Sequence, residues 1–138
     1  MRLFFYGTLL DPDVRALVIG PRASHVTVTP ARLADWRRRR ARGKSYPIIL
    51  RAPGEQVAGV VTSMLDADAV NRLSRYEGPG YGLFDCRPVL EDGSAVPAQV
   101  FQPTERLAAD DADWDLAAWQ STEKAKWLSM LRRGVLNV

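Results

Sequence analysis

The sequence holds one cysteine and one histidine in 138 residues. Cys86 alone forms no internal disulfide, which favours a reducing compartment, and one His with one Cys excludes a His/Cys zinc site. No apolar run approaches the ~20 residues of a membrane span, and the stretch from Leu3 to Tyr6 is too short for a secretory signal. We therefore expect a cytoplasmic protein without a membrane segment, a metal or a disulfide.

The net charge of +3 hides an uneven distribution. Six of the 19 positive residues lie in the stretch Arg37–Lys44, and the remaining 13 face 16 acidic residues. We interpret this stretch as an exposed, solvated loop between two strands. Because no aromatic residue interleaves it, we do not expect nucleic-acid binding, and an RNA-contacting domain that uses Arg37–Lys44 is the weakest alternative.

Hydrophobic periodicity predicts one domain over residues 1–138 with strands and helices in mixed order. The strands are predicted at 2–6, 31–36, 48–50, 57–64, 84–90 and 96–101, with turns at Pro53-Gly54 and Asp92-Gly93. Helices are predicted after the N-cap residues Asp11 and Asp66, and over 115–133. Strands outnumber helices and short turns join several of them, so we expect an α+β fold, a small mixed β-barrel flanked by two or three helices.

The first candidate site segment is Tyr6-Gly7-Thr8-Leu9, where the first strand feeds through a glycine into a helix N-terminus. Backbone N–H groups of such a loop can bind a carboxylate or phosphate, and Gly7 has no Cβ to hold a ligand off. The other glycines and the lysine of a P-loop are absent. Spacing alone therefore leaves an ordinary strand-to-helix turn as the alternative.

The second segment centres on Glu77, which stands between Tyr76 and Tyr81 where a helix ends in Gly-Pro-Gly. Aromatic neighbours that desolvate a carboxylate raise its pKa above the usual value of about 4.3. A raised pKa makes it a better base near neutral pH. A surface glutamate in a polar turn is the alternative on these residues alone.

Together, Tyr-Gly-Thr-Leu at residues 6–9 and Tyr-Glu-Gly-x-x-Tyr at 76–81 resemble the γ-glutamylcyclotransferase-like (AIG2-like) family. The resemblance covers most of the chain, including Tyr46-Pro47 and the tryptophan-bearing C-terminal helix. It implies the family fold, a small mixed barrel with helices outside.

The resemblance also implies a reaction that needs no cofactor. The α-amine of a γ-glutamyl amide attacks its own γ-carbonyl, which releases 5-oxoproline and a free amine or amino acid. The implied general acid/base is Glu77. The residues implied to bind the small-molecule substrate are Tyr6, Gly7, Thr8, Leu9, Tyr46 and Tyr81.

One departure from the family pattern concerns Leu83. Many relatives carry an arginine two residues after the second tyrosine, whereas Tyr81 is followed here by Gly82-Leu83. A changed specificity, or a non-catalytic small-molecule binding or regulatory domain of the same fold, is therefore the alternative to turnover. The amine of the substrate and the choice between monomer and homodimer stay open.

Overall fold

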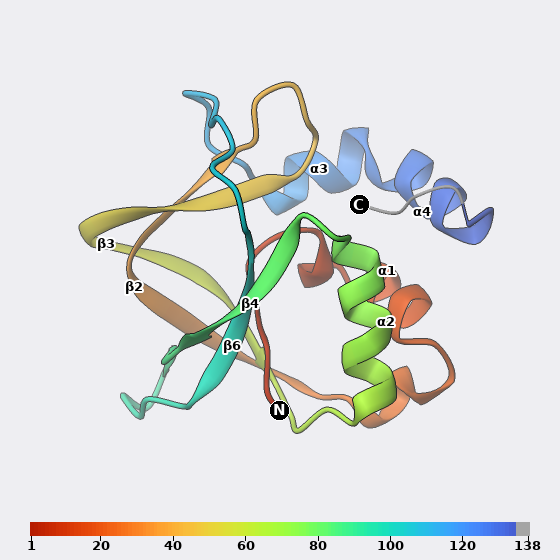
Figure 1. Ribbon diagram of the computed structural model, residues 1–138, viewed down its shortest axis with the longest axis horizontal. Helices are drawn as coiled ribbons and strands as arrows, with labels where there is room; N and C mark the ends of the chain where they lie inside the picture. The colour runs from red at the N-terminus through yellow and green to blue at the C-terminus, as the bar shows by residue number, and fades with distance from the viewer. Residues whose placement is uncertain (135–138) are drawn as a thin grey trace.

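The structure is a computed structural model that describes residues 1–134 (Figure 1). Its strands are β1 (Phe4–Phe5), β2 (Val28–Arg40), β3 (Pro47–Thr62), β4 (Tyr81–Cys86), β5 (Val89–Leu90) and β6 (Ala98–Pro103). Its helices are α1 (Pro12–Ile19), α2 (Ala67–Glu77), α3 (Leu116–Thr122) and α4 (Lys124–Arg132), with 3-10 turns η1 (Thr8–Leu10) and η2 (Gly20–His25). None of the described helices is long and apolar enough to cross a membrane. The expected α+β class is confirmed.

The strands form two sheets with free edges. One has the order β1-β3-β2-β5, and β4 pairs with β6 in the other. Within residues 1–134, a single parallel bridge, Leu3 with Gln99, joins the two sheets. The expected barrel was wrong, because β5 is only two residues long and no ladder continues from β4 to close the ring. Figure 1 shows α1 and α2 beside the sheets and α3–α4 along another edge.

The turn that we predicted at Pro53-Gly54 lies within strand β3 of the long β2–β3 hairpin. Its connecting turn is at residues 41–46, and the pairing register shifts near Asp35 in the middle of β2. Asp35 has a φ of 69° and Gly54 a φ of 86°, and the Gly54 amide donates to the Asp35 carboxylate at 3.1 Å. The predicted turn was therefore wrong: these residues form an irregularity within a continuous strand, of the kind that bends a sheet.

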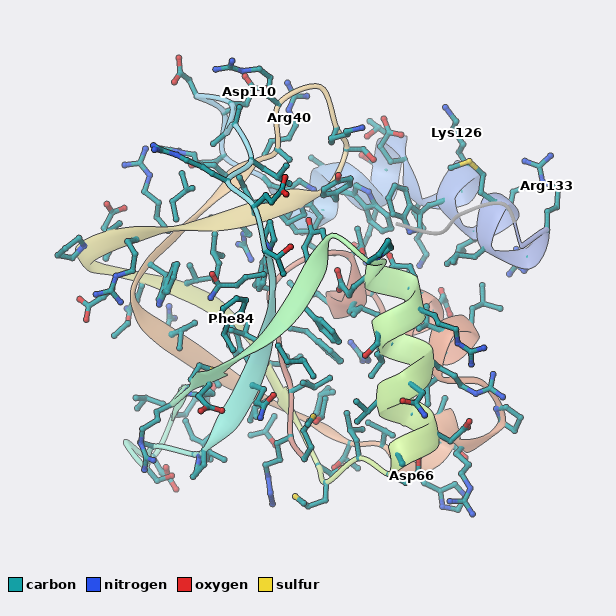
Figure 2. The ribbon with its side chains drawn as sticks, viewed as in Figure 1. Arg40, Asp66, Phe84, Asp110, Lys126 and Arg133 are labelled. Carbon is teal, nitrogen blue, oxygen red and sulfur yellow. The ribbon has the colours of Figure 1, made fainter. Side chains whose placement is uncertain are left out.

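The stretch Arg37–Lys44 is an exposed loop only in its second half: residues 42–44 lie exposed in the turn between β2 and β3, whereas residues 37–40 belong to a strand. Residues 37–40 are the last four of β2, and backbone hydrogen bonds join Arg40 and Arg42 to residues 108, 110 and 112. Arg39 pairs with Asp113 and Arg40 with Asp110, the second pair being visible in Figure 2. The basic run is thus neutralised in part by the acidic stretch that follows the last strand.

Both predicted aspartate caps are confirmed. Asp11 accepts hydrogen bonds from two amides at the start of α1, and Asp66 accepts one from Ala69 at the start of α2. Asp11 is wholly buried, and its second carboxylate oxygen accepts hydrogen bonds from Gln120 and Lys124 at 2.9 Å each. This capping residue therefore also fastens the C-terminal helices to α1.

The helix predicted over 115–133 is interrupted at Glu123. That residue leaves the helical conformation with a φ of −120°, so α3 ends before it and α4 starts after it. Gly134 follows α4 with a φ of 67°, as expected for a C-terminal cap. The aromatic side chains of this region pack inward, and Trp127 of α4 is buried against the core formed by α1 and α2.

Candidate active site

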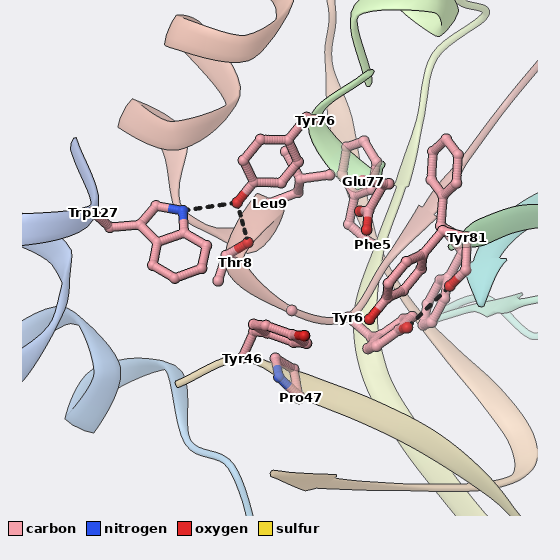
Figure 3. A pocket seen from close by; sticks show the side chains of 13 residues that line it. Phe5, Tyr6, Thr8, Leu9, Tyr46, Pro47, Tyr76, Glu77, Tyr81 and Trp127 are labelled. Carbon is pink, nitrogen blue, oxygen red and sulfur yellow. Dashed lines mark hydrogen bonds between the residues drawn. The ribbon is translucent and has the colours of Figure 1, made fainter. Parts of the chain in front are cut away.

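One pocket gathers the residues that the sequence singled out. It lies where the loop after β1, the start of β3, the end of α2 and α4 meet (Figure 3). Its lining residues are Phe4, Phe5, Tyr6, Gly7, Thr8, Leu9, Tyr46, Pro47, Tyr76, Glu77, Tyr81, Phe101 and Trp127. All seven predicted site residues are among them, although their roles in binding and catalysis stay predictions.

Glu77 is the one charged side chain in the described lining of this pocket. It is the last residue of α2, and Gly78 ends the helix with a φ of 91° while its amide still donates to Ser74. No group in residues 1–134 donates a hydrogen bond to the carboxylate. Burial raises the pKa of Glu77 to about 8, because aromatic walls replace the water that would stabilise the charged form.

Two tyrosine hydroxyls are held by the protein. The Tyr76 hydroxyl lies 2.5 Å from Thr8 Oγ1 and accepts a hydrogen bond from Trp127 Nε1 at 2.9 Å (Figure 3). The Tyr6 hydroxyl donates to the Phe101 carbonyl at 2.9 Å. These bonds fix the rings that form the walls and connect α2, α4 and β6 around the pocket.

Two other tyrosine hydroxyls make no hydrogen bond within residues 1–134, those of Tyr46 and Tyr81. Burial, together with the negative charge of Glu77, raises the pKa of both phenols. Each therefore stays a neutral O–H at physiological pH. They are the side-chain donors that the pocket can offer to a ligand.

The loop from Gly7 to Leu9 contributes backbone donors. No acceptor in residues 1–134 takes a hydrogen bond from the amides of Gly7, Thr8 or Leu9, whereas the Gly7 and Thr8 carbonyls accept from the amides of Leu10 and Asp11 at 2.9 and 3.1 Å. In a trans peptide the carbonyl and the amide point to opposite sides. The bonded carbonyls of Gly7 and Thr8 therefore turn the amides of Thr8 and Leu9 to the other side, where both stay free. Such a set favours an anionic group.

The absence of a side chain at Gly7 has a steric reason. A Cβ there would lie 3.0 Å from Cγ and 3.2 Å from Cδ of Pro47, a ring that forms the opposite wall. Any larger residue would push Pro47 and the neighbouring Tyr46 away from the loop. Glycine therefore sets the width of the pocket as well as access to its amides.

Sequence reasoning missed Tyr76 and Trp127 as parts of the lining, whereas the family resemblance had already placed Tyr46-Pro47 near the pocket. Tyr76 was named only as a neighbour of Glu77, and Trp127 only as a core anchor; Trp127 is indeed buried, but its indole N–H also bonds Tyr76. The helical spacing of Leu73 and Tyr76 was the signal that Tyr76 turns inward on α2. Nothing in the sequence joined Trp127 to it, since 51 residues separate them.

Leu83 lies outside this pocket. It borders an adjoining open groove that shares Tyr81 and Phe101 with the pocket. No arginine, lysine or histidine lines the pocket itself within residues 1–134. In the same part of the chain, no group of three or more His, Cys, Asp or Glu side chains is arranged to hold a metal ion.

The fold is that of a cyclotransferase-like α+β protein. Residues 3–121 match the family described as gamma-glutamyl cyclotransferase, AIG2-like, so the chain belongs to that family and the resemblance is confirmed. AIG2-like protein D of Arabidopsis thaliana is 27% identical over 134 residues, covering 94% of this chain and 86% of the relative. Protein AIG2 C of the same plant is 28% identical over 137 residues, covering 95% and 79%.

Solved structures share the fold at lower identity. The solution structure of an Arabidopsis thaliana protein is 24% identical with a TM-score of 0.66, covering 96% of this chain and 88% of that one. A structure named gamma-glutamyl cyclotransferase is 17% identical with a TM-score of 0.63, covering 96% and 86%. At these identities the likeness extends to the arrangement of the chain and no further.

Proposed function

We propose that the protein is a cofactor-independent γ-glutamyl cyclotransferase with Glu77 as its general acid/base. The α-amine nitrogen of a γ-glutamyl amide attacks the γ-carbonyl carbon, a five-membered ring closes, and the C–N bond to the leaving amine breaks. The products are 5-oxoproline and a free amine or amino acid. The observation that carries this proposal is a single buried carboxyl in an aromatic pocket that is also lined by the loop of residues 7–9, whose amides donate to no group in residues 1–134.

The raised pKa suits the proton transfers of this reaction. The substrate amine must lose a proton before it attacks, and an α-amino group has a pKa of about 8. An ordinary glutamate is about 3.5 pKa units too acidic, so accepting that proton would cost roughly 5 kcal/mol. With its pKa raised to about 8, Glu77 accepts the proton at little cost and then delivers it to the leaving nitrogen.

The remaining groups account for binding and orientation. The free amides of residues 7–9 are suited to the substrate α-carboxylate or to the oxyanion that develops on the γ-carbonyl. The unbonded hydroxyls of Tyr46 and Tyr81 add two donors. Since the attack is intramolecular, holding the bent conformer in a pocket with aromatic walls supplies much of the rate enhancement.

Two other functions are weaker on physical grounds. A binding or regulatory domain would need the pocket but not a carboxyl with a raised pKa, and burying such a carboxyl lowers the stability of the folded protein. RNA binding through Arg37–Lys44 would have to compete with Glu55, Asp110 and Asp113, which already pair with Arg37, Arg40 and Arg39.

The test is release of 5-oxoproline from γ-glutamyl amides of varied leaving amine. Wild type is compared with Glu77→Gln, which keeps the shape of the side chain but removes the base, and with Glu91→Gln, a matched change at an exposed turn residue. We expect Glu77→Gln to lose a factor of ~100 or more in kcat and Glu91→Gln to be unaffected.

Turnover that survives Glu77→Gln would refute the role of Glu77. Binding of 5-oxoproline or a γ-glutamyl amide without any turnover would favour the non-catalytic domain.

A further inference from the structure

Arg38 touches the candidate site from behind. Its Nη1 donates to the Tyr6 carbonyl at 2.9 Å and to the Ala58 carbonyl at 3.2 Å. The side chain is half-buried in β2, and it is not part of the pocket lining. It therefore approaches the loop from the side away from the cavity.

This contact fixes the direction of one peptide group. The Tyr6 carbonyl and the Gly7 amide belong to the same planar, trans peptide, so a donor that holds the carbonyl on one side turns the amide to the other. Gly7 itself has no side chain that would restrict this plane. In residues 1–134, the bond from Arg38 is the one hydrogen bond recorded to the Tyr6 carbonyl from a side chain.

We propose that Arg38 is a positioning residue for the active site: it holds the Tyr6 carbonyl outward so that the Gly7 amide faces the substrate. This inference rests on the proposed function. It gives one member of the arginine run a role that the charge pattern of the sequence did not suggest.

A tryptophan keeps Arg38 in place. The guanidinium carbon lies 5.5 Å from the centre of the Trp114 ring, and Trp114 is 5% exposed. The Trp114 Nε1 donates to the Ser45 carbonyl at 2.8 Å, directly before Tyr46 in the pocket lining. The Arg38–Trp114 pair thus supports both walls of the pocket mouth, the loop after β1 and the start of β3.

A lysine does not reproduce this geometry. The guanidinium lies over the indole while its Nη1 donates to two carbonyls, whereas an ammonium on a flexible stem makes a less oriented contact. Arg37, the preceding residue of β2, provides a control. It pairs with Glu55 at 3.7 Å, and within residues 1–134 it makes no hydrogen bond to the loop and no cation–π contact with Trp114.

The experiment compares wild type with Arg38→Met, Arg38→Lys and Arg37→Met. It measures kcat/KM for the best γ-glutamyl amide across pH, the melting temperature, and the ¹⁵N–¹H resonance of Gly7 while 5-oxoproline is added. We expect Arg38→Met to lose at least tenfold in kcat/KM and to weaken the Gly7 response to 5-oxoproline by a similar factor. Arg38→Lys should lose less, and Arg37→Met should behave as wild type.

The pH profile separates positioning from catalysis and from unfolding. If Arg38 acts only through the loop, the apparent pKa of the acid limb, which reports Glu77, stays the same while the maximum falls. The inference is overturned if the loss of kcat/KM in Arg38→Met only reflects the fraction of protein that is unfolded at the assay temperature. It is also overturned if Arg37→Met loses as much. If no γ-glutamyl amide is turned over, the proposed function fails, and the Gly7 titration with 5-oxoproline then tests the role of Arg38 by itself. Tenfold weaker binding of 5-oxoproline by Arg38→Met supports the inference. Equal binding by the two proteins, or no binding by wild type, overturns it.

Discussion

Replacing Glu77 with glutamine should stabilise the folded protein more as the pH rises. Burial raises the pKa of Glu77 from about 4.5 to about 8, so between these values the folded state binds a proton that the unfolded state has released. Stability therefore falls with rising pH across this window in wild type. Glutamine does not ionise, so the variant lacks this contribution.

The size of the effect follows from the two pKa values. Between pH 5.5 and pH 8, proton linkage at Glu77 lowers the free energy of unfolding of wild type by about 3 kcal/mol. The difference in unfolding free energy between Glu77→Gln and wild type should grow by that amount over the same range. Every other titrating group is common to both proteins, so its contribution cancels in the difference.

The assay is guanidinium chloride denaturation followed by tryptophan fluorescence at pH 5.5, 6.5, 7.2 and 8. Glu91→Gln, at an exposed turn, should give a difference from wild type that does not change with pH. If the difference for Glu77→Gln also stays within about 1 kcal/mol across the range, the carboxyl is not desolvated as argued. The proposed proton transfer would then lose its physical basis.

Three further predictions concern rate and stability. The kcat/KM for 5-oxoproline release should rise about tenfold per pH unit up to about pH 8, because Glu77 of the free enzyme must be ionised to accept a proton from the substrate ammonium. A profile that is flat from pH 6 to pH 8 would contradict this. Gly59→Ala should lower the free energy of unfolding by more than about 2 kcal/mol in denaturant unfolding, since a Cβ there would lie 2.2 Å from the Phe5 carbonyl oxygen. A loss below about 1 kcal/mol would show that β1 shifts freely. Asp11→Ala should lower the free energy of unfolding by roughly 3 kcal/mol, because it removes a helix cap and a buried partner of Lys124. Asp11→Asn keeps the cap and should therefore lower it less in the same measurement.

Local chemistry predicted the features that depend on a few neighbouring residues. The Asp11 and Asp66 caps were predictable because each needs only a side-chain oxygen before a helix start. For Glu77, the flanking aromatic residues indicated desolvation, but on these residues alone a surface glutamate stayed the alternative, and the family resemblance favoured the site. The assignment of residues 6–9 as a candidate substrate-binding loop came from a family resemblance, since spacing alone left an ordinary turn as the alternative.

The failures share a different origin. Pro53-Gly54 is a strong turn signal locally, but Asp35 on the paired strand accepts the Gly54 amide and keeps the strand continuous. The arginine run looked solvated because its acidic partners follow about 70 residues later, and nothing in a single sequence states that the two segments pair.

The position of Arg38 outside the pocket resolves a conflict between two needs of the proposed reaction. An anionic substrate group requires donors, yet a cation next to Glu77 would lower its pKa and weaken it as a base for an amine. Among residues 1–134, the pocket lining offers backbone amides and phenols, which carry no formal charge, as donors, and burial alone raises the pKa of Glu77. Arg38 acts on the far side of the Tyr6 carbonyl, so it can orient an amide dipole without facing the carboxyl. An arginine placed within the pocket would bind the substrate carboxylate more strongly, but it would do so at the expense of the proton transfer.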